Sequence, residues 1–337
     1  MLSMPRNQIS GTLPEEVGRA VSLITLDLRS NNLEGTLPST IGSVSQTLKK
    51  LQLGENSLTG SLPKELGNLT ELEEFGLYMN QFAGAIPINL GALKLLKSLY
   101  LDSNRLESTI PPSLSSLTSL VDLRLRDNKL QGTIPPGLSA LENLEVLYLD
   151  DNDLSGTIPY QLSKLRNLEE LHLHKNELQG SLSPSLFTLD KLTQLYVDHN
   201  RLQGSIPDEI GGLRSIEQIY LYENALTGSI PSSLSELGSL ERFRVEYNML
   251  SGALPYDLGN NLRLEYLSVN ANNIHGQLPE SMSKMINLKT FHFSGNSIRG
   301  KVSEEMCKLT EDNLVEMTAD CKGDDPDVEC SCCSECF

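Results

Sequence analysis

Apolar residues recur along this chain in a pattern that repeats every 24 residues. One complete copy, residues 144–159, reads L-x-x-L-x-L-x-x-N-x-L-x-G-x-I-P. Its Leu147 and Leu149 alternate with outward-facing neighbours, and this alternation predicts a short strand with one buried face. The copies, one step of which is 25 residues, have their asparagines at Asn31, Asn56, Asn80, Asn104, Asn128, Asn152, Asn176, Asn200, Asn224, Asn248, Asn272 and Asn296, with an incomplete copy at Asn7.

Each position of the repeat has a physical reason. Stacked copies let the strands pair in parallel and close their backbone hydrogen bonds between coils. A buried asparagine such as Asn152 can satisfy the amides and carbonyls of the turn that follows, which predicts an asparagine ladder. Gly156 allows a backbone conformation closed to most side chains, and Pro159 favours a second short strand before it. The P-x-x-L-x-x-L spacing that begins at Pro111 predicts a helical turn on the outer side.

These features predict an α/β solenoid: a right-handed superhelix of about 13 repeats with a concave parallel β-sheet. We expect the repeat array to cover residues 1–303 and a C-terminal cap to cover residues 304–337. The L-x-G-x-I-P extension resembles the plant-type class of leucine-rich repeats. That class includes the ectodomains of receptor-like kinases and receptor-like proteins, and the polygalacturonase inhibitors.

The C-terminal segment differs from the repeats in its cysteines. Residues 314–319 still fit L-x-x-L-x-L and predict one last strand. All six cysteines follow or flank it, at Cys307, Cys321, Cys330, Cys332, Cys333 and Cys336. An even number in a short segment favours a disulfide cap and an oxidising compartment, with 15 pairings open; a zinc knot is the alternative. The tail resembles the C-terminal cap of diatom-type leucine-rich-repeat proteins.

The N-terminus begins within a predicted strand, because Leu2 and Met4 occupy the two inward positions. Neither a signal peptide nor a cysteine cap is present before them. Solenoid ends need capping, so we expect the protein to continue upstream of Met1 or the sequence to be truncated. The alternative is that Met1 is the natural start and the first coil frays.

Composition narrows the functional classes. With 44 acidic and 27 basic residues the net charge is −17, which disfavours nucleic acid and anionic lipid as partners. No apolar run is long enough for a membrane-spanning helix, so this chain is not expected to insert into a membrane. Kinase motifs are absent, and no Ser–His–Asp or paired-carboxylate arrangement stands out. We therefore expect no enzyme activity, no cofactor and no metal.

Tyrosine is concentrated at outward strand positions, whereas Phe75, Phe243, Phe291 and Phe293 occupy inward ones. Tyrosine and arginine are common anchors of recognition surfaces, although strands also favour tyrosine for structural reasons. The cluster on consecutive strands predicts a ligand-binding site on the concave face, formed by Tyr148, His172, His174, Tyr196, Asp198, Tyr220, Tyr222 and Arg244.

Two further features concern modification and metal binding. His172 and His174 point the same way, near Asp150 and Asp198 of neighbouring coils, and could hold a metal or form a solvated, pH-sensitive patch. We favour the patch, because no closed ligand shell is evident. Asn68 begins the only glycosylation sequon, which is a weak signal on the outer side of the coil.

The resemblance and the face together predict a non-catalytic recognition module: a receptor-like extracellular domain that binds a peptide, protein or glycan. A co-receptor is a further expected partner. The chain would be extracellular or a cell-surface ectodomain, with any anchor upstream of Met1. Two alternatives remain: a secreted inhibitor of cell-wall-degrading enzymes, similar to the polygalacturonase inhibitors, and an adhesive or structural surface protein.

Overall fold

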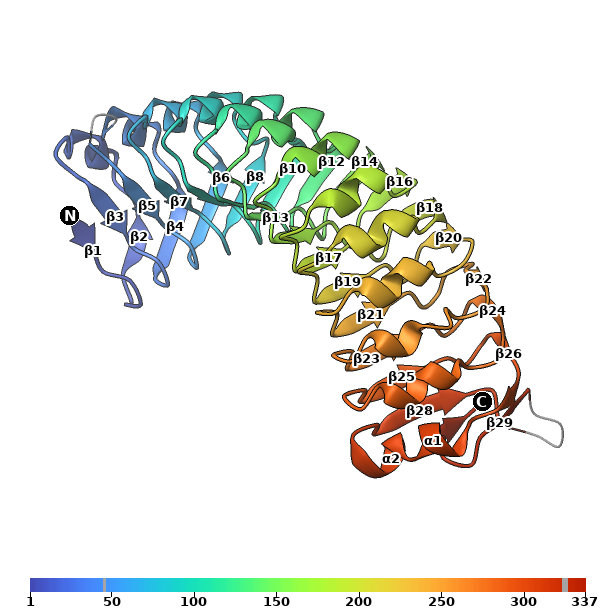
Figure 1. The fold of residues 1–337 in the computed structure, drawn as a ribbon. Helices are drawn as coiled ribbons and strands as arrows, with labels where there is room; N and C mark the ends of the chain where they lie inside the picture. The colour runs from blue at the N-terminus through green and yellow to red at the C-terminus, as the bar shows by residue number, and fades with distance from the viewer. Residues whose placement is uncertain (45–46, 323–326) are drawn as a thin grey trace. The chain divides into compact units, whose positions relative to one another are not determined.

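The computed structural model describes residues 1–44, 47–322 and 327–337 of the chain. The chain forms two compact units, Met1–Leu168 and Glu169–Phe337. In both units the repeats form coils, each with a short strand of a main sheet, a second short strand and a 3-10 helix (Figure 1). No break in the 24-residue period marks the boundary between the units.

The main sheet of each unit is parallel and in register. Leu26 pairs with Leu51, and Leu51 pairs with Phe75, so equivalent repeat positions lie side by side. The predicted parallel solenoid is thus confirmed. The strands in the first unit are β1 (Leu2–Ser3), β3 (Thr25–Asp27), β5 (Lys50–Gln52), β7 (Glu74–Gly76), β9 (Ser98–Tyr100), β11 (Asp122–Arg124) and β13 (Val146–Tyr148). Those in the second are β15 (Glu170–His172), β17 (Gln194–Tyr196), β19 (Gln218–Tyr220), β21 (Arg242–Arg244), β23 (Tyr266–Ser268), β25 (Thr290–His292), β28 (Glu316–Ala319) and β30 (Glu335–Cys336).

The segments around the L-x-G positions form the predicted second strands, which we call the outer strands. They also pair in parallel. In the first unit they are β2 (Ser10–Thr12), β4 (Asn32–Thr36), β6 (Ser57–Ser61), β8 (Gln81–Gly84), β10 (Arg105–Thr109), β12 (Lys129–Thr133) and β14 (Asp153–Thr157). In the second they are β16 (Glu177–Gly180), β18 (Arg201–Ser205), β20 (Ala225–Thr227), β22 (Ser251–Gly252), β24 (Asn273–Gly276), β26 (Ser297–Ile298) and β27 (Gly300–Lys301). Strand β29 (Val328–Glu329) lies in the C-terminal cap and pairs with β27.

The helical turns lie opposite the main sheet in each unit (Figure 1). They are 3-10 helices, because leucines at every third residue align on one side of a helix with three residues per turn. Leu114, Leu117 and Leu120 show this spacing, and all three are fully buried. The helices are η1 (Glu15–Arg19), η2 (Ser39–Val44), η3 (Lys64–Asn68), η4 (Ile88–Ala92), η5 (Pro112–Ser116), η6 (Pro136–Ala140), η7 (Tyr160–Lys164), η8 (Pro184–Thr188), η9 (Asp208–Gly212), η10 (Ser232–Glu236), η11 (Leu258–Asn260) and η12 (Glu280–Lys284).

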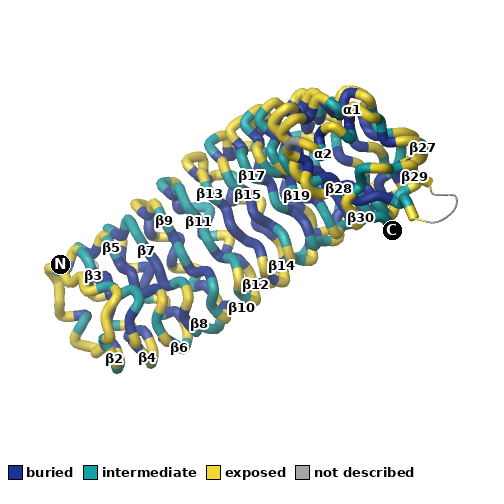
Figure 2. The backbone as a smooth tube through the Cα atoms, turned by 90° about the horizontal axis from the view of Figure 1, so that it is seen from below, coloured by how far each residue is buried: buried dark blue, intermediate teal, exposed yellow. Residues whose placement is uncertain are grey.

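The core lies between the sheet and the helices in every coil, and Figure 2 shows buried positions recurring from coil to coil. It consists mainly of leucine, with isoleucine, valine and phenylalanine. Phe75, Phe243, Phe291 and Phe293 are fully buried, as their inward positions predict. Each coil buries its leucines only against its neighbours, as expected for a solenoid.

The repeat asparagines connect successive coils by hydrogen bonds. Asn152 Nδ2 lies 3.1 Å from the carbonyl oxygens of Leu125, Leu149 and Asp150, and its Oδ1 accepts the Leu130 amide at 2.9 Å. Leu125 and Leu130 belong to the preceding coil, so each asparagine completes the hydrogen bonds of the coil before its own. The same bonds are made by Asn31, Asn56, Asn80, Asn104, Asn128, Asn200, Asn224, Asn248, Asn272 and Asn296.

The L-x-G glycines have positive φ, and at Gly156 the angle is 78°. The Thr133 methyl carbon lies only 2.8 Å from where a Cβ on Gly156 would be, so space as well as conformation requires glycine there. Ser108 is the one non-glycine residue at this position and has φ of 72°. The residue 23 positions earlier, equivalent to Thr133, is Ala85, a smaller side chain that leaves more room for Ser108.

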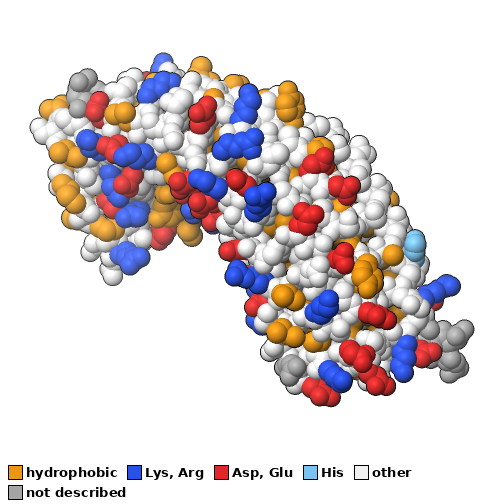
Figure 3. Space-filling view, in the orientation of Figure 1, with side chains coloured by type: hydrophobic (Ala, Val, Ile, Leu, Met, Phe, Trp, Pro, Cys, Tyr) orange, Lys and Arg blue, Asp and Glu red, His pale blue; other side chains and the backbone are white. Residues whose placement is uncertain are grey.

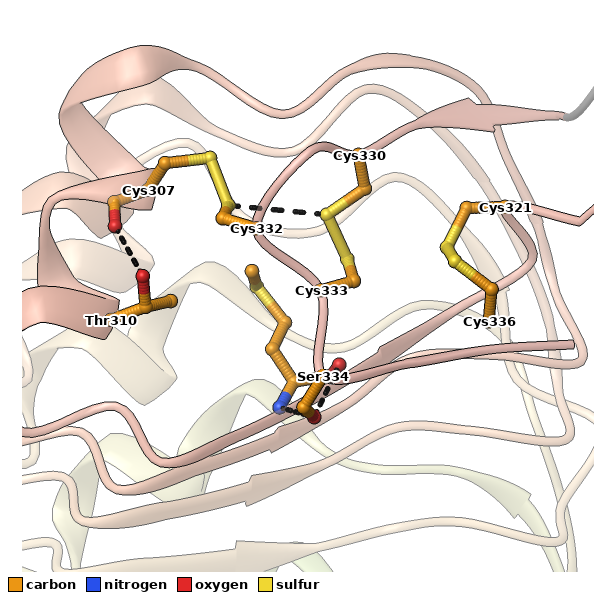
Figure 4. The surroundings of a disulfide bond; sticks show 9 residues. Cys307, Thr310, Cys321, Cys330, Cys332, Cys333, Ser334 and Cys336 are labelled. Carbon is orange, nitrogen blue, oxygen red and sulfur yellow. Dashed lines mark hydrogen bonds between the residues drawn. A yellow bond between two sulfur atoms is a disulfide. The ribbon is translucent and has the colours of Figure 1, made fainter.

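The C-terminal cap holds the α-helical segments α1 (Glu304–Cys307) and α2 (Leu309–Asp312). The six cysteines form three disulfides, Cys307–Cys332, Cys321–Cys336 and Cys330–Cys333 (Figure 4). Strand β28 forms where the pattern predicts it, but the prediction of a single last strand is wrong. Strand β30 pairs with β28, because the Cys321–Cys336 disulfide brings the tail back to the sheet.

Asp320 lies 24 residues after Asn296, at the position of the next ladder asparagine. Its carboxylate accepts the amides of Gly295 and Asn296 at 2.9 and 3.2 Å. A carboxylate can accept hydrogen bonds but cannot donate them. Asp320 therefore accepts amides of the last regular coil but cannot make the bonds to carbonyl oxygens that an asparagine makes.

Candidate functional site

Four predicted site residues occupy equivalent positions on consecutive main-sheet strands of the second unit: His172, Tyr196, Tyr220 and Arg244. His172 and Tyr196 stack with ring centroids 4.3 Å apart and planes at 15°. Tyr196 and Tyr220 stack at 4.3 Å and 9°. The parallel register brings these side chains together, because equivalent residues of adjacent strands lie about 4.8 Å apart.

Stacking determines what these rings can offer to a ligand. A flat aromatic surface is expected from the sequence, but Tyr196 stacks between His172 and Tyr220, so both faces of its ring are covered. The hydroxyls of Tyr196 and Tyr220 both donate to Gln218 Oε1, at 2.6 and 3.3 Å. The rings therefore present their edges and polar ends in a fixed orientation, which lowers the entropy cost of binding.

The neighbouring column of the second unit contains His174, Asp198 and Tyr222. Arg244 lies over the Tyr222 ring, 3.9 Å from its centroid. Arg244 also donates from Nε to Glu246 Oε1 at 2.8 Å, and Glu246 is buried. Burial, and then the charge of Asp198, raise the pKa of Tyr222, so its hydroxyl stays protonated at neutral pH. We call the seven predicted residues of the second unit the aromatic face.

The eighth predicted residue, Tyr148, belongs to the first unit. The guanidinium groups of Arg124 and Arg126 lie 5.0 and 5.5 Å from its ring centroid. Its described contacts therefore belong to the arginine cluster on β11 and the turn that follows.

Histidine 199 was not among the predicted residues, yet it lies beside them. Its Nδ1 is 2.9 Å from Asp198 Oδ2, and its Nε2 is 3.1 Å from Glu223 Oε2. Its ring also packs edge-on against Tyr222. The turn residue before each asparagine has positive φ, and His199, like Ser30, contacts the equivalent turn residue of the next coil. The alternation of strand residues does not contain this signal.

Metal binding finds no support in the second unit's histidines. Within residues 1–44, 47–322 and 327–337, no group of three or more His, Cys, Asp and Glu side chains is arranged to hold a metal ion. Asn68, the predicted glycosylation position, is exposed at the end of η3. Across the described part of the chain, no helix is long and apolar enough to cross a membrane.

The first unit has a hollow of about 760 Å³ on its main-sheet face that the sequence analysis missed. Two of its lining side chains, Tyr78 and Gln52, lie against glycines at outward positions, Gly54 and Gly76. A Cβ on Gly54 would lie 2.6 Å from the Tyr78 ring, and one on Gly76 would lie 2.1 Å from Gln52 Oε1. Neither glycine has a positive φ, so space requires glycine here, and a search for clustered side chains cannot detect it.

The hollow is lined by paired charges. Arg29 makes two hydrogen bonds to Asp27, at 2.8 and 2.9 Å. Burial raises the pKa of Asp27, but the bonds from Arg29 outweigh it and leave the pKa below its ordinary value. The full lining is Arg29, Gln52, Glu74, Tyr78, Met79, Lys97, Ser98, Tyr100, Asp102, Val121, Asp122, Arg124 and Arg126.

Tyr100, Asp122 and Arg124 form a connected network at one end of the hollow. The Tyr100 hydroxyl donates to Asp122 Oδ2 at 2.9 Å, and Arg124 donates to both carboxylate oxygens at 2.9 Å. Burial, with the negative charge of Asp122, raises the pKa of Tyr100 to about 12. Figure 3 shows acidic and basic side chains interspersed over the visible surface rather than gathered by sign.

Comparisons with known proteins settle the family. Two leucine-rich-repeat family models match, one at residues 94–154 and 142–202, the other at residues 22–44, 47–69, 263–285 and 287–309. A leucine-rich-repeat protein of Leptospira interrogans is 30% identical, over 92% of this chain and 81% of that one, with a TM-score of 0.68. The chain belongs to the leucine-rich-repeat family.

Among leucine-rich-repeat proteins of known structure, plant receptors are close matches. The Arabidopsis receptor kinase HAESA, solved in complex with the peptide hormone IDA and the co-receptor SERK1, is 30% identical over 94% of this chain, with a TM-score of 0.88. A TDR receptor is 28% identical over 98% of this chain, with a TM-score of 0.86. The leucine-rich-repeat chain described here spans 54% and 59% of the length of those two chains. A comparison with curated proteins finds no significant match.

Proposed function

We propose that this leucine-rich-repeat chain is a non-catalytic, extracellular recognition module that binds an extended peptide on the aromatic face of its second unit. The observation that carries the proposal is the stack of His172, Tyr196 and Tyr220, which ends at Arg244. Such a row of fixed rings beside a guanidinium resembles the anchors that dominate protein recognition surfaces.

The dimensions of the face suit a short extended segment. The five strands from β15 to β23 cover about 20 Å, at about 4.8 Å per strand. An extended peptide of about six residues has that length. Tyr196 and Tyr220 would supply apolar contact along it, and the buried carboxylate of Asp198 and the guanidinium of Arg244 would select its charges.

The comparisons support a peptide as the ligand class. HAESA was solved with a peptide hormone and a co-receptor, and a plant peptide hormone receptor, RGFR1, was solved with RGF2. The similarity to receptor ectodomains, the plant-type L-x-G-x-I-P extension and the disulfide cap all favour placement outside the cell. A co-receptor is part of the same proposal.

The test is selection of binders from a phage-displayed library of random dodecapeptides, followed by titration of the selected peptides. The double variant Tyr196→Ala/Tyr220→Ala should weaken binding by about a hundredfold, since anchor residues contribute about 2 kcal/mol or more. The matched control is Lys164→Ala/Arg166→Ala, on the helical side of the first unit. Loss of binding in the control alone would show that the ligand site is elsewhere.

A second candidate function is adsorption to ice, which an exposed column of small hydroxyl side chains favours. The last residue of the outer-strand segment is threonine or serine in nearly every coil of the first unit, and all are exposed: Thr12, Thr36, Ser61, Thr109, Thr133 and Thr157. Their spacing follows the strand distance of about 4.8 Å. A plant ice-binding protein is 30% identical over 74% of this chain and 80% of that one, with a TM-score of 0.61.

An ice-recrystallisation assay tests this candidate. The variant Thr109→Lys/Thr133→Lys interrupts the column and should abolish any inhibition of crystal growth. The tyrosine double variant leaves the column intact and serves as the control. Absence of inhibition by the unaltered protein would exclude the function.

A further inference from the structure

The hollow of the first unit is a second site that is separate from the aromatic face. Its volume of about 760 Å³ lies within the range of about 300–1,000 Å³ typical of small-molecule sites. Its lining residues all belong to the first unit, on strands β5 to β11 and on the segments that flank strands β3 to β11. The seven residues of the aromatic face all belong to the second unit, so different variants test the two sites.

Two side chains that line the hollow, Gln52 and Tyr78, lie against glycines. Gln52 and Gly76 are paired in register on β5 and β7, and the Gln52 side chain lies in the space that a Gly76 side chain would fill. In the same way the Tyr78 ring lies over Gly54. Tyr78 and Tyr100 meet at 76° with centroids 6.5 Å apart and form an angled aromatic wall.

Most of the charged side chains that line the hollow are already in ion pairs. Arg29 is paired with Asp27, Lys97 with Glu73, and Arg124 with Asp122. Glu74 is paired in the same way with Lys50. A charged ligand would therefore have to compete with an existing ion pair, which leaves one partner unpaired at a cost.

Two lining charges, Asp102 and Arg126, have no ion-pair partner among the residues that the structure describes, and they have opposite signs. Asp102 is only 8% exposed, and burial raises the pKa of its carboxyl group. Gln52 is 3% exposed, and its Oε1 has no hydrogen-bond partner within the described residues. The hollow thus has spare acceptors and a spare donor, while its other charges are already in ion pairs.

We propose that this hollow binds a neutral oligosaccharide. A sugar hydroxyl both donates and accepts, so it can donate to Asp102 or Gln52 and accept from Arg126 without disturbing the ion pairs. The terminal amide torsion of glutamine is broad, and its rotation turns the Gln52 carbonyl towards the ligand. The rings of Tyr78 and Tyr100 offer apolar contact to the C–H groups of the sugar.

The test is isothermal titration of the whole chain with cellohexaose, xylohexaose and mannohexaose, and with hexagalacturonate as an acidic counterpart. At least one neutral hexasaccharide should bind. Its affinity should change less than about twofold when the salt concentration is raised, because a neutral ligand makes no screened ion pair. Binding of hexagalacturonate alone, or of no probe, overturns the proposal.

Variants locate the site. Gly76→Ala pushes the flexible Gln52 amide into the hollow, and Asp102→Asn removes a charged acceptor without changing its size. Each should weaken binding by about tenfold, equivalent to about 1.4 kcal/mol. Gly238→Ala is the matched control, because a Cβ there meets no atom within 4 Å. A Gly76→Ala protein that fails to fold is recognised by its melting curve, and Asp102→Asn then decides alone.

Tyr196→Ala/Tyr220→Ala separates this site from the proposed peptide site. That variant should bind the hexasaccharide as the unaltered protein does. Equal loss in this variant and in Asp102→Asn would show that the sugar does not occupy the hollow.

Discussion

The main-sheet faces of the two units share one backbone plan and differ in what their side chains do with it. In the first unit Tyr78 and Gln52 lie in the space that side chains at Gly54 and Gly76 would fill, and both line a hollow. In the second unit His172, Tyr196 and Tyr220 occupy consecutive strands and close their faces against each other. The strand pairing and register are the same in both. The two faces therefore differ in the size and packing of their side chains rather than in backbone geometry.

The largest expected effect tests whether the asparagine ladder stabilises both units equally. Asn80→Ala in the first unit and Asn248→Ala in the second should each lower the free energy of unfolding by about 3 kcal/mol. Each change leaves several buried backbone groups without partners, at about 1–3 kcal/mol per group before water enters. Denaturant unfolding measures both, with the exposed Asp153→Ala as the control, expected within about 0.5 kcal/mol. A large difference between the two asparagines would break the equivalence of the units.

The second prediction sharpens the contrast between the faces. Tyr196 and Tyr220 should show a coupling energy of about 0.5–1.5 kcal/mol in a double-mutant cycle of alanine variants. Tyr220 paired with the exposed Tyr256 supplies the control cycle and should show no coupling. If the two cycles agree, the stacked rings act independently and the aromatic face is not a unit.

The third prediction concerns the one departure from the plan in the outer strands. Ser108→Gly should raise the free energy of unfolding by about 0.5 kcal/mol, because relief of the left-handed conformation outweighs the greater entropy of unfolded glycine. Gly156→Ser is the matched reverse change and should cost more than that, since Thr133 also crowds the site. A destabilised Ser108→Gly protein would mean that the serine makes a contact that outweighs its strain.

The smallest effect is a difference in pH dependence within the first unit. Despite burial, the Arg29 bonds lower the pKa of Asp27, so its stabilisation is present above the unfolded pKa of about 3.9 and is lost as pH falls through the lower folded value. Burial raises the pKa of Asp102, so the folded state loses stability as pH rises from about 3.9 through the raised value.

Melting curves between pH 3 and pH 7 check both signs. Relative to the unaltered protein, Asp102→Asn should gain stability as pH rises, whereas Asp27→Asn should lose it. Parallel curves for the two variants would show that neither carboxyl responds to its surroundings as described.

The fold was predictable from the sequence because each repeat position has one local task. The period, the alternation of Leu147 and Leu149 and the asparagines predict the parallel coils. A leucine at every third residue predicts the helical turns, and their 3-10 form follows from that spacing. The cap was less predictable, since six cysteines allow 15 pairings and strand β30 depends on which of them forms.

The candidate site was only partly accessible from sequence. Outward positions identify which side chains share a face, and this placed seven residues together in the second unit. Alternation says nothing about ring planes, so it could not show that Tyr196 and Tyr220 cover each other's faces. The alternation also identifies only side chains that are present, whereas the placement of Tyr78 and Gln52 in the hollow depends on two that are absent, at Gly54 and Gly76.

The asparagine ladder has a direction, and this bears on how the chain matures on the ribosome. The side chain of Asn152 completes hydrogen bonds of the coil that begins 24 residues earlier, and its described bonds are to that coil and its own. A nascent coil therefore stays incomplete until the next asparagine has been translated and has left the exit tunnel. Growth moves this single unfinished coil along the chain, and Asp320 and the disulfides of the cap complete the last regular coil.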